Sequence, residues 1–161
     1  MNELKIHLSE ESATQSVGEL LAQCVRAPLN LAFNGPLGAG KSTLIRAFLR
    51  KLGVQGSIKS PTYALVEPYS LSNYFVYHFD FYRFFDENEW EDSGFRDYFN
   101  PHSICLVEWA EKAGRVLPPM DLEISMAYDT QGEHVGRTLT AQSCSPAGQE
   151  IVKQLQNALK L

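Results

Sequence analysis

One glycine-rich loop restricts the possible folds of this chain more than any other stretch. Residues 35–42 read GPLGAGKS and fit the phosphate-binding P-loop pattern G-x-x-x-x-G-K-[ST]. Its glycines let backbone N–H groups approach an anion, Lys41 adds a positive charge that reaches the β and γ phosphates, and Ser42 offers a hydroxyl to Mg²⁺. The pattern predicts a nucleotide-phosphate site made by Gly35, Pro36, Leu37, Gly38, Ala39, Gly40, Lys41, Ser42 and Thr43.

The residues on either side of the loop have the periodicity that a P-loop requires. An apolar run at 29–33 is typical of a buried strand. After the loop, apolar residues recur at helical spacing from Leu44 to Leu52, and Gly53 is a good helix stop. The sequence therefore predicts a strand, the glycine loop and a helix in direct succession.

The remaining segments predict strands and helices that alternate early and strands that pair late. Gly56 and the pair Ser60-Pro61 exclude a helix there. We expect a first strand through Leu4, Ile6 and Leu8, a helix over 10–25 with Ser9 as N-cap, a strand at 64–67 closed by Pro68, strands at 73–80 and 104–107, a hairpin of 121–128 with 135–142, and a helix over 146–161. The pattern favours one α/β domain, residues 1–161: a P-loop NTPase-like three-layer sandwich with a central mixed, mainly parallel sheet.

Composition limits the classes of partner. The chain has 44% hydrophobic and 20% charged residues and a net charge of −5, an ordinary globular balance that argues against a broad basic surface for DNA or for unaided RNA binding. The polar N-terminus lacks the apolar core of a signal peptide, and no stretch is long enough to span a membrane. Three scattered cysteines without a C-x-x-C pair predict reduced thiols, so we expect a cytoplasmic protein.

Two acidic residues are candidates to work with the P-loop. Phosphoryl chemistry needs a carboxylate near the metal, usually at the C-terminal end of a buried strand. Glu108 ends the run at 104–107 and Asp80 ends the run at 75–79. Either could hold Mg²⁺, directly or through water, while the other positions the attacking water. Thr62 is either a switch residue that senses the γ phosphate or a plain turn threonine.

Four further features have both a chemical and a structural interpretation. Arg83 compensates transition-state charge or is a solvated surface arginine. From position alone, Trp109 favours core packing over stacking on a nucleotide base, and His78 favours a structural hydrogen bond over catalysis. The D-x-x-G match at 129–132 is interpreted as a hairpin turn, because no N-K-x-D motif for guanine exists in the chain.

Five segments, in this order along nearly the whole chain, resemble the TsaE (YjeE) family of bacterial ATPases for tRNA threonylcarbamoyladenosine biosynthesis. They read LGAGKST at 37–43, KSPTY at 59–63, YHFDFYR at 77–83, RDYF at 96–99 and CLVEW at 105–109. A P-loop alone would not identify this family. The S-P-T-[FY], H-F-D-x-Y-R and V-E-W motifs are far more specific.

The resemblance implies a small ATPase that binds ATP and Mg²⁺ and works with the TsaB–TsaD pair. It would reset that complex between rounds of tRNA modification beside the anticodon, and would meet tRNA only through the complex. The family pattern implies catalytic roles for Lys41, Asp80, Glu108 and Thr62, metal ligands among Ser42, Glu108 and Asp80, and nucleotide contacts from Glu11, Thr14 and Trp109. Two departures are Pro36, which replaces an acidic residue and removes a backbone donor, and Ser42, which replaces threonine but keeps the hydroxyl.

Two other functions fit a P-loop of this size. A small-molecule kinase needs a lid that closes on the phosphates and usually bears arginine, whereas the long insertion at 86–97 is acidic. A nucleotide-binding adaptor would never hydrolyse ATP. The acidic and aromatic stretch 86–99 favours a partner-dependent ATPase, because it is a plausible docking surface.

Overall fold

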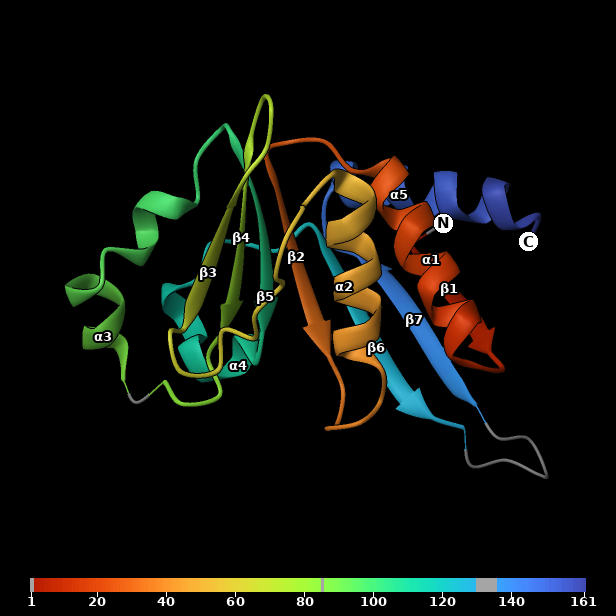
Figure 1. The fold of residues 1–161 in the computed structure, drawn as a ribbon, viewed down its shortest axis with the longest axis horizontal. Coiled ribbons are helices and arrows are strands. Elements are labelled where there is room, and N and C mark those ends of the chain that lie inside the picture. The colour runs from red at the N-terminus through yellow and green to blue at the C-terminus, as the bar shows by residue number, and fades with distance from the viewer. Residues whose placement is uncertain (1, 85, 130–135) are drawn as a thin grey trace.

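A single mixed sheet forms the centre of the molecule (Figure 1). The computed structural model describes residues 2–84, 86–129 and 136–161. Within these residues seven strands follow the order β1-β7-β6-β2-β5-β4-β3. Their bounds are β1 Glu3–Leu8, β2 Leu29–Asn34, β3 Val66–Ser70, β4 Phe75–Asp80, β5 Ser103–Glu108, β6 Leu122–Tyr128 and β7 Arg137–Ser143. Strands β6, β2, β5 and β4 are parallel, and β1, β7 and β3 join through antiparallel pairs, which confirms the predicted α/β fold with a mixed, mainly parallel sheet.

Helices cover the two faces of the sheet unequally. The helices are α1 Glu11–Cys24, α2 Lys41–Leu52, α3 Glu87–Asp92, α4 Ala110–Ala113 and α5 Pro146–Leu159, with short 3-10 helices at Phe95–Tyr98 and Gly114–Val116. In Figure 1, α1 and α2 lie across one face and α4 lies behind β5 on the other. Helix α5 packs against β7, β1 and α1. Strands β1 and β6 alternate buried and exposed residues, so the third layer covers only the β4–β5 part of the sheet.

Two apolar clusters lie on opposite sides of the sheet because strand residues alternate in direction. On the α2 side, Val76 and Leu106 pack with the apolar faces of α1, α2 and α5. On the other side, Phe79 and Val107 pack with aromatic residues of the segment that follows β4. Every residue of β5 is buried, as expected for a strand with parallel neighbours on both sides and helices above and below.

Several predicted elements are confirmed. Helix α2 ends at Leu52, and Gly53 caps it in the left-handed conformation with φ of 117°. No helix crosses Gly56 or Pro61. Strands β6 and β7 form the antiparallel pair expected near the C-terminus, but residues 130–135, which include most of the D-x-x-G match, lie outside the described residues. All three cysteines are free, and none of the helices in the described residues has the length and apolar character needed to cross a membrane.

Three local predictions were wrong. Glu10, rather than Ser9, is the N-cap of α1, because the first helical hydrogen bonds go to the Glu10 carbonyl. Pro68 lies in the middle of β3 instead of closing a strand at 64–67. An edge strand tolerates proline because half of its backbone N–H groups face away from the sheet.

The third correction concerns the acidic stretch 86–99. Its aromatic residues do not form a docking surface, since Trp90 and Phe95 are 0% and 4% exposed and belong to the second apolar cluster. Asp86 caps α3 through a capping box with Glu89. The exposed residues described in this segment are polar or glycine and include Asp86, Glu91, Asp92 and Asp97.

Candidate nucleotide site

The P-loop connects β2 to α2 and passes close to the neighbouring strand β6. Gly35 has a φ of +142°, and a Cβ atom there would lie 2.4 Å from the carbonyl oxygen of Met126. Gly40 has a φ of +102° and is the N-cap of α2. The first backbone N–H groups of α2 therefore have no partner within their own helix, and unpaired N–H groups at the start of a helix are suited to bind an anion.

Two residues from β6 and β7 brace the loop from outside. The Tyr128 hydroxyl donates to the carbonyl oxygen of Leu37 at 3.0 Å, and the Arg137 guanidinium donates to the carbonyl oxygen of Gly38 at 3.3 Å. The Arg137 guanidinium also lies 4.2 Å from the centre of the Tyr128 ring. Sequence reasoning missed both residues, because no local motif marks them and they lie 91 and 99 positions downstream of the loop residues that they contact.

The two predicted carboxylates meet at the same edge of the sheet. Asp80 and Glu108 are the last residues of the parallel strands β4 and β5 and are partners in the strand register. Side chains alternate in direction along a strand, so Asp80 points to the same face as His78 and Glu108 to the same face as Leu106. That is the face that α2 covers. Each is 9% exposed. The parallel pairing thus brings both acids to the start of α2.

Two neighbouring side chains, those of Lys41 and His78, hold the Glu108 carboxylate. The Lys41 Nζ lies 3.9 Å from Glu108 Oε1, and His78 Nε2 donates to Glu108 Oε2 at 2.7 Å. His78 is 5% exposed, and its Nδ1 has no hydrogen-bond partner among the described residues. The predicted structural hydrogen bond of His78 is present.

Asp80 is held by two hydrogen bonds to backbone groups. Its Oδ1 accepts a hydrogen bond from the Tyr82 N–H at 2.9 Å, and its own N–H donates to the carbonyl oxygen of Leu65 at 3.0 Å. Burial raises the pKa of Asp80, and the nearby charge of Glu108 adds to this, while the Tyr82 hydrogen bond, His78 and Lys41 lower it. The bond to Leu65 ties the segment that carries Thr62 to the end of β4.

A cavity of about 300 Å³ lies between the loop and these carboxylates. The structure brings together most of the predicted site there, since the cavity is lined by Leu37, Gly38, Gly40, Lys41, Ser42, Thr43, Ser60, Thr62, Asp80, Glu108 and Trp109. The hydroxyl oxygens of Thr62 and Ser60 lie 2.6 Å apart. Ser42 is exposed. Both predicted hydroxyl groups are therefore within reach of a ligand in this cavity.

Trp109 both packs against the second apolar cluster and lines the cavity. It directly follows Glu108 with a φ of 58°, an unusual backbone conformation for a bulky residue. Its ring centre lies 5.0 Å from the Lys41 Nζ, and the Tyr82 ring is also 5.0 Å away. The position of Trp109 in the sequence favoured core packing, and the structure shows that core packing is only part of what this residue does. The ring also limits where the Lys41 ammonium can lie.

A second cavity, of about 330 Å³, lies on the other side of the P-loop, where β1 leads into α1. Its lining includes Glu11 and Thr14 and shares Gly38, Gly40 and Thr43 with the first cavity. The two residues predicted to approach the nucleotide base are therefore on the opposite side of the loop from the carboxylates. Ala39 also lines this second cavity, whereas Gly35 and Pro36 line neither of the two.

The side chains present fit a magnesium ion that a nucleotide also holds. Within the described residues, no group of three or more His, Cys, Asp or Glu side chains could hold a metal by itself. The cavity offers one hydroxyl, from Ser42, and two carboxylates, from Asp80 and Glu108. Mg²⁺ prefers such hard oxygen ligands and usually keeps water and phosphate oxygens in its coordination sphere. Arg83 does not line this cavity; its guanidinium lies 4.6 Å from the centre of the exposed Tyr63 ring.

Comparison with known proteins gives one family. The model of the family "Threonylcarbamoyl adenosine biosynthesis protein TsaE" matches residues 8–138. A "tRNA threonylcarbamoyladenosine biosynthesis protein TsaE" from Haemophilus influenzae is 53% identical over 95 residues, which are 59% of this chain and 60% of that protein. The protein of the same name from Bacillus subtilis is 35% identical over 124 residues, 77% of each chain.

A solved structure has the same fold. The crystal structure of Bacillus subtilis YdiB superposes with a TM-score of 0.77 and 24% identity, covering 97% of this chain and 95% of that one. The family model covers most of the chain, including the P-loop, both carboxylates and Trp109. The chain therefore belongs to the TsaE family.

Proposed function

We propose that this chain is a P-loop ATPase that binds ATP with Mg²⁺ and acts with a TsaB–TsaD complex in the threonylcarbamoyladenosine modification of tRNA beside the anticodon. Its role is to reset that complex between turnovers, in the cytoplasm. Family membership supports the pathway, since the relatives are named for tRNA threonylcarbamoyladenosine biosynthesis. The observation that carries the ATPase assignment is the meeting of Lys41, Asp80 and Glu108 at one end of the P-loop cavity.

The chemistry follows from what these side chains do. The loop N–H groups and Lys41 bind the phosphates, and Lys41 exchanges its contact with Glu108 for one with the nucleotide. Ser42 and one of the two carboxylates would hold Mg²⁺, which when bound would neutralise charge on the phosphates. The other carboxylate orients the attacking water. His78 keeps Glu108 aligned after Lys41 has left it.

Slow hydrolysis by the isolated chain is part of the proposal. Among the described residues, the lining of the P-loop cavity contains no arginine. P-loop enzymes that lack an arginine at the transferred phosphate turn over slowly until a partner supplies the missing stabilisation. A partner that docks at the mouth of the cavity would therefore control the rate.

Reconstitution tests the proposal. Purified protein, TsaB, TsaD, unmodified tRNA and ATP are expected to give several modified tRNAs per complex, and wild-type protein to release phosphate faster in the complex than alone. Lys41→Ala protein, with its fold verified by circular dichroism, is expected to give at most one round. Equal turnover with and without this chain, or fast multiple-turnover hydrolysis by the purified monomer, would contradict the proposal.

A further inference from the structure

Two neighbouring helices of this protein carry charge of opposite sign. The charged residues of α1 are Glu11 and Glu19, and it has no lysine or arginine. Helix α2 has no acidic residue and carries Lys41, Arg46, Arg50 and Lys51. Although the chain is acidic, no aspartate or glutamate occurs between residues 35 and 66. The stretch from the P-loop to the end of α2 therefore has a net positive charge in an acidic chain.

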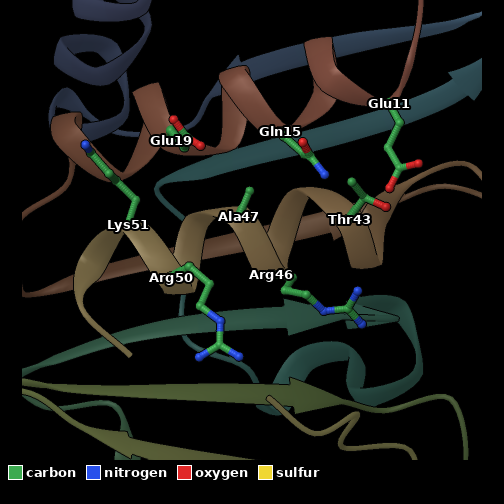
Figure 2. Close-up of a pocket in the computed structure, with 8 residues that line it drawn as sticks. All are labelled: Glu11, Gln15, Glu19, Thr43, Arg46, Ala47, Arg50 and Lys51. Atoms are coloured by element: carbon green, nitrogen blue, oxygen red, sulfur yellow. The ribbon is translucent and has the colours of Figure 1, made fainter. Parts of the chain in front are cut away.

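The two helices are in close contact, yet their charges do not pair. A Cβ atom on Gly18 of α1 would lie 2.7 Å from the Leu44 carbonyl oxygen and 3.0 Å from the Ala47 Cβ of α2. No ion pair nevertheless joins the two helices, both of which the structure describes throughout. In Figure 2 the side chains of Arg46 and Arg50 extend away from α1, whereas that of Lys51 extends toward it. The opposite charges thus remain available to a third group.

A groove of about 410 Å³ runs along the contact between these helices. One wall carries the α1 residues and the other the α2 residues, and the lining consists of Glu11, Gln15, Glu19, Thr43, Arg46, Ala47, Arg50 and Lys51 (Figure 2). Arg50 also donates to the Val54 carbonyl oxygen at 3.1 Å, whereas Arg46 and Lys51 are exposed and make no ion pair with any described residue. We call this feature the α1–α2 groove.

We propose that the α1–α2 groove is the docking site for a segment of a protein partner that presents carboxylates to α2 and amines or guanidinium groups to α1. The inference deepens the proposed function and depends on it, because that function requires protein partners. Complementary charge gives such a contact its orientation and its rate of association. A neutral segment would bury the helix charges without partners and lose affinity.

The charge pattern favours a protein over RNA. A phosphate backbone would be attracted by Arg46 and Lys51 but repelled by Glu11 and Glu19 on the facing wall. A polypeptide can carry both signs at the spacing of one helix, as the two walls require.

The groove also adjoins the nucleotide. Glu11 and Thr43 line both the α1–α2 groove and the second cavity beside the P-loop. Thr43 directly follows Ser42, the predicted magnesium ligand. A segment bound in the groove would therefore contact two residues that also border the cavity beside the P-loop, which would couple docking to nucleotide binding there.

Charge reversal tests the proposal on both walls. The variants are Arg46→Glu with Lys51→Glu on α2, and Glu19→Lys on α1. Their matched controls are Lys153→Glu and Glu150→Lys, exposed residues of α5 outside the groove. Thermal unfolding verifies the fold, and the glutamine pair Arg46→Gln with Lys51→Gln replaces the first variant if it fails to fold. The probes are the purified TsaB–TsaD complex and, separately, unmodified tRNA, each titrated at low and moderate salt.

The proposal predicts that reversal on either wall weakens binding to TsaB–TsaD by about tenfold or more at low salt, while the α5 controls bind like wild type. The affinity of the isolated variants for ATP stays unchanged. If wild type binds TsaB–TsaD and all variants bind equally well, the groove is not the docking site and the proposed function stands. If wild type does not bind TsaB–TsaD at all, both proposals fail.

RNA would give a different pattern. Reversal on α2 would then weaken binding to tRNA, Glu19→Lys would strengthen it, and neither would change binding to TsaB–TsaD. That result would overturn the docking of a protein segment in favour of a polyanion site.

Discussion

Gly35 is the position where the shape of the P-loop can be tested most sharply. The variant Gly35→Ala would place a methyl group 2.4 Å from the Met126 carbonyl oxygen, a backbone atom of β6 that cannot move without disturbing the sheet. Gly38→Ala is the matched control. Its φ of +80° is equally unsuited to alanine, but its methyl group would meet the Tyr128 hydroxyl, at 2.6 Å, at the end of a side chain that can turn aside.

Both variants lose stability because alanine disfavours a positive φ, but only Gly35→Ala also presses its methyl group against a backbone atom. A left-handed backbone costs a non-glycine residue roughly 1–2 kcal/mol, and restricting the unfolded chain returns about 0.4–1 kcal/mol. Gly38→Ala should therefore lower the free energy of unfolding by about 1 kcal/mol. Overpacking against Met126 adds roughly 1–3 kcal/mol, so Gly35→Ala should lose about 2–4 kcal/mol in total.

Urea and thermal unfolding measure both losses. For a domain of this size 1 kcal/mol corresponds to about 2–4 °C in Tm, so Gly35→Ala should melt roughly 4–16 °C below wild type. It should also bind ATP more weakly, because the loop must withdraw from β6. The reasoning is refuted if Gly35→Ala loses no more stability than Gly38→Ala.

Three further changes test the site. Lys41→Ala should abolish ATP binding in a calorimetric titration while the protein stays folded, because Lys41 is the one lysine or arginine among the described residues that line the P-loop cavity; unchanged binding would refute the site assignment. Asp80→Asn should stop hydrolysis yet stabilise the fold at neutral pH. Because the pKa of Asp80 is raised in the folded state, ionisation of Asp80 lowers the free energy of unfolding of the wild type. The stability difference between Asp80→Asn and wild type is therefore absent below the ordinary pKa of 3.8, where Asp80 is protonated in both states, and it grows as pH rises from there through the folded pKa. Unfolding curves at several pH values check this, and a pH-independent difference would contradict it. His78→Leu should cost about 1–3 kcal/mol and slow hydrolysis because Glu108 loses its N–H donor, and His78→Gln should recover part of both; equal loss in the two variants would show that packing, and not the donor, matters.

The parts of the fold that depend on contiguous residues could be predicted from the sequence. β2, the P-loop and α2 follow one another, so their strand pattern, glycines and helix pattern could be interpreted together, and Gly53 marked the end of α2. The run at 104–107 indicated a strand buried on both faces because it is apolar without alternation, and β5 is buried throughout.

The parts that depend on distant partners could not be predicted. Nothing near Pro68 shows that β3 is an edge strand, and this alone makes proline acceptable there. The aromatic residues after β4 suggested a surface until their packing on Phe79 and Val107 was known.

The site follows the same division. Strand ends marked Asp80 and Glu108 as candidates, but only the parallel register of β4 and β5 makes them neighbours. Tyr128 and Arg137, which hold the P-loop by hydrogen bonds, lie 91 and 99 positions from the loop residues that they contact and belong to no motif of their own. The sequence thus predicts which side chains are candidates for the site, and the sheet order determines which of them meet.

A structure of the protein with a non-hydrolysable ATP analogue and Mg²⁺ tests the central claim most directly. We expect the triphosphate on the backbone N–H groups ahead of Lys41, with the metal between Ser42 and an oxygen of Asp80 or Glu108. A ligand bound elsewhere, or both carboxylates turned away from the phosphates, would contradict it.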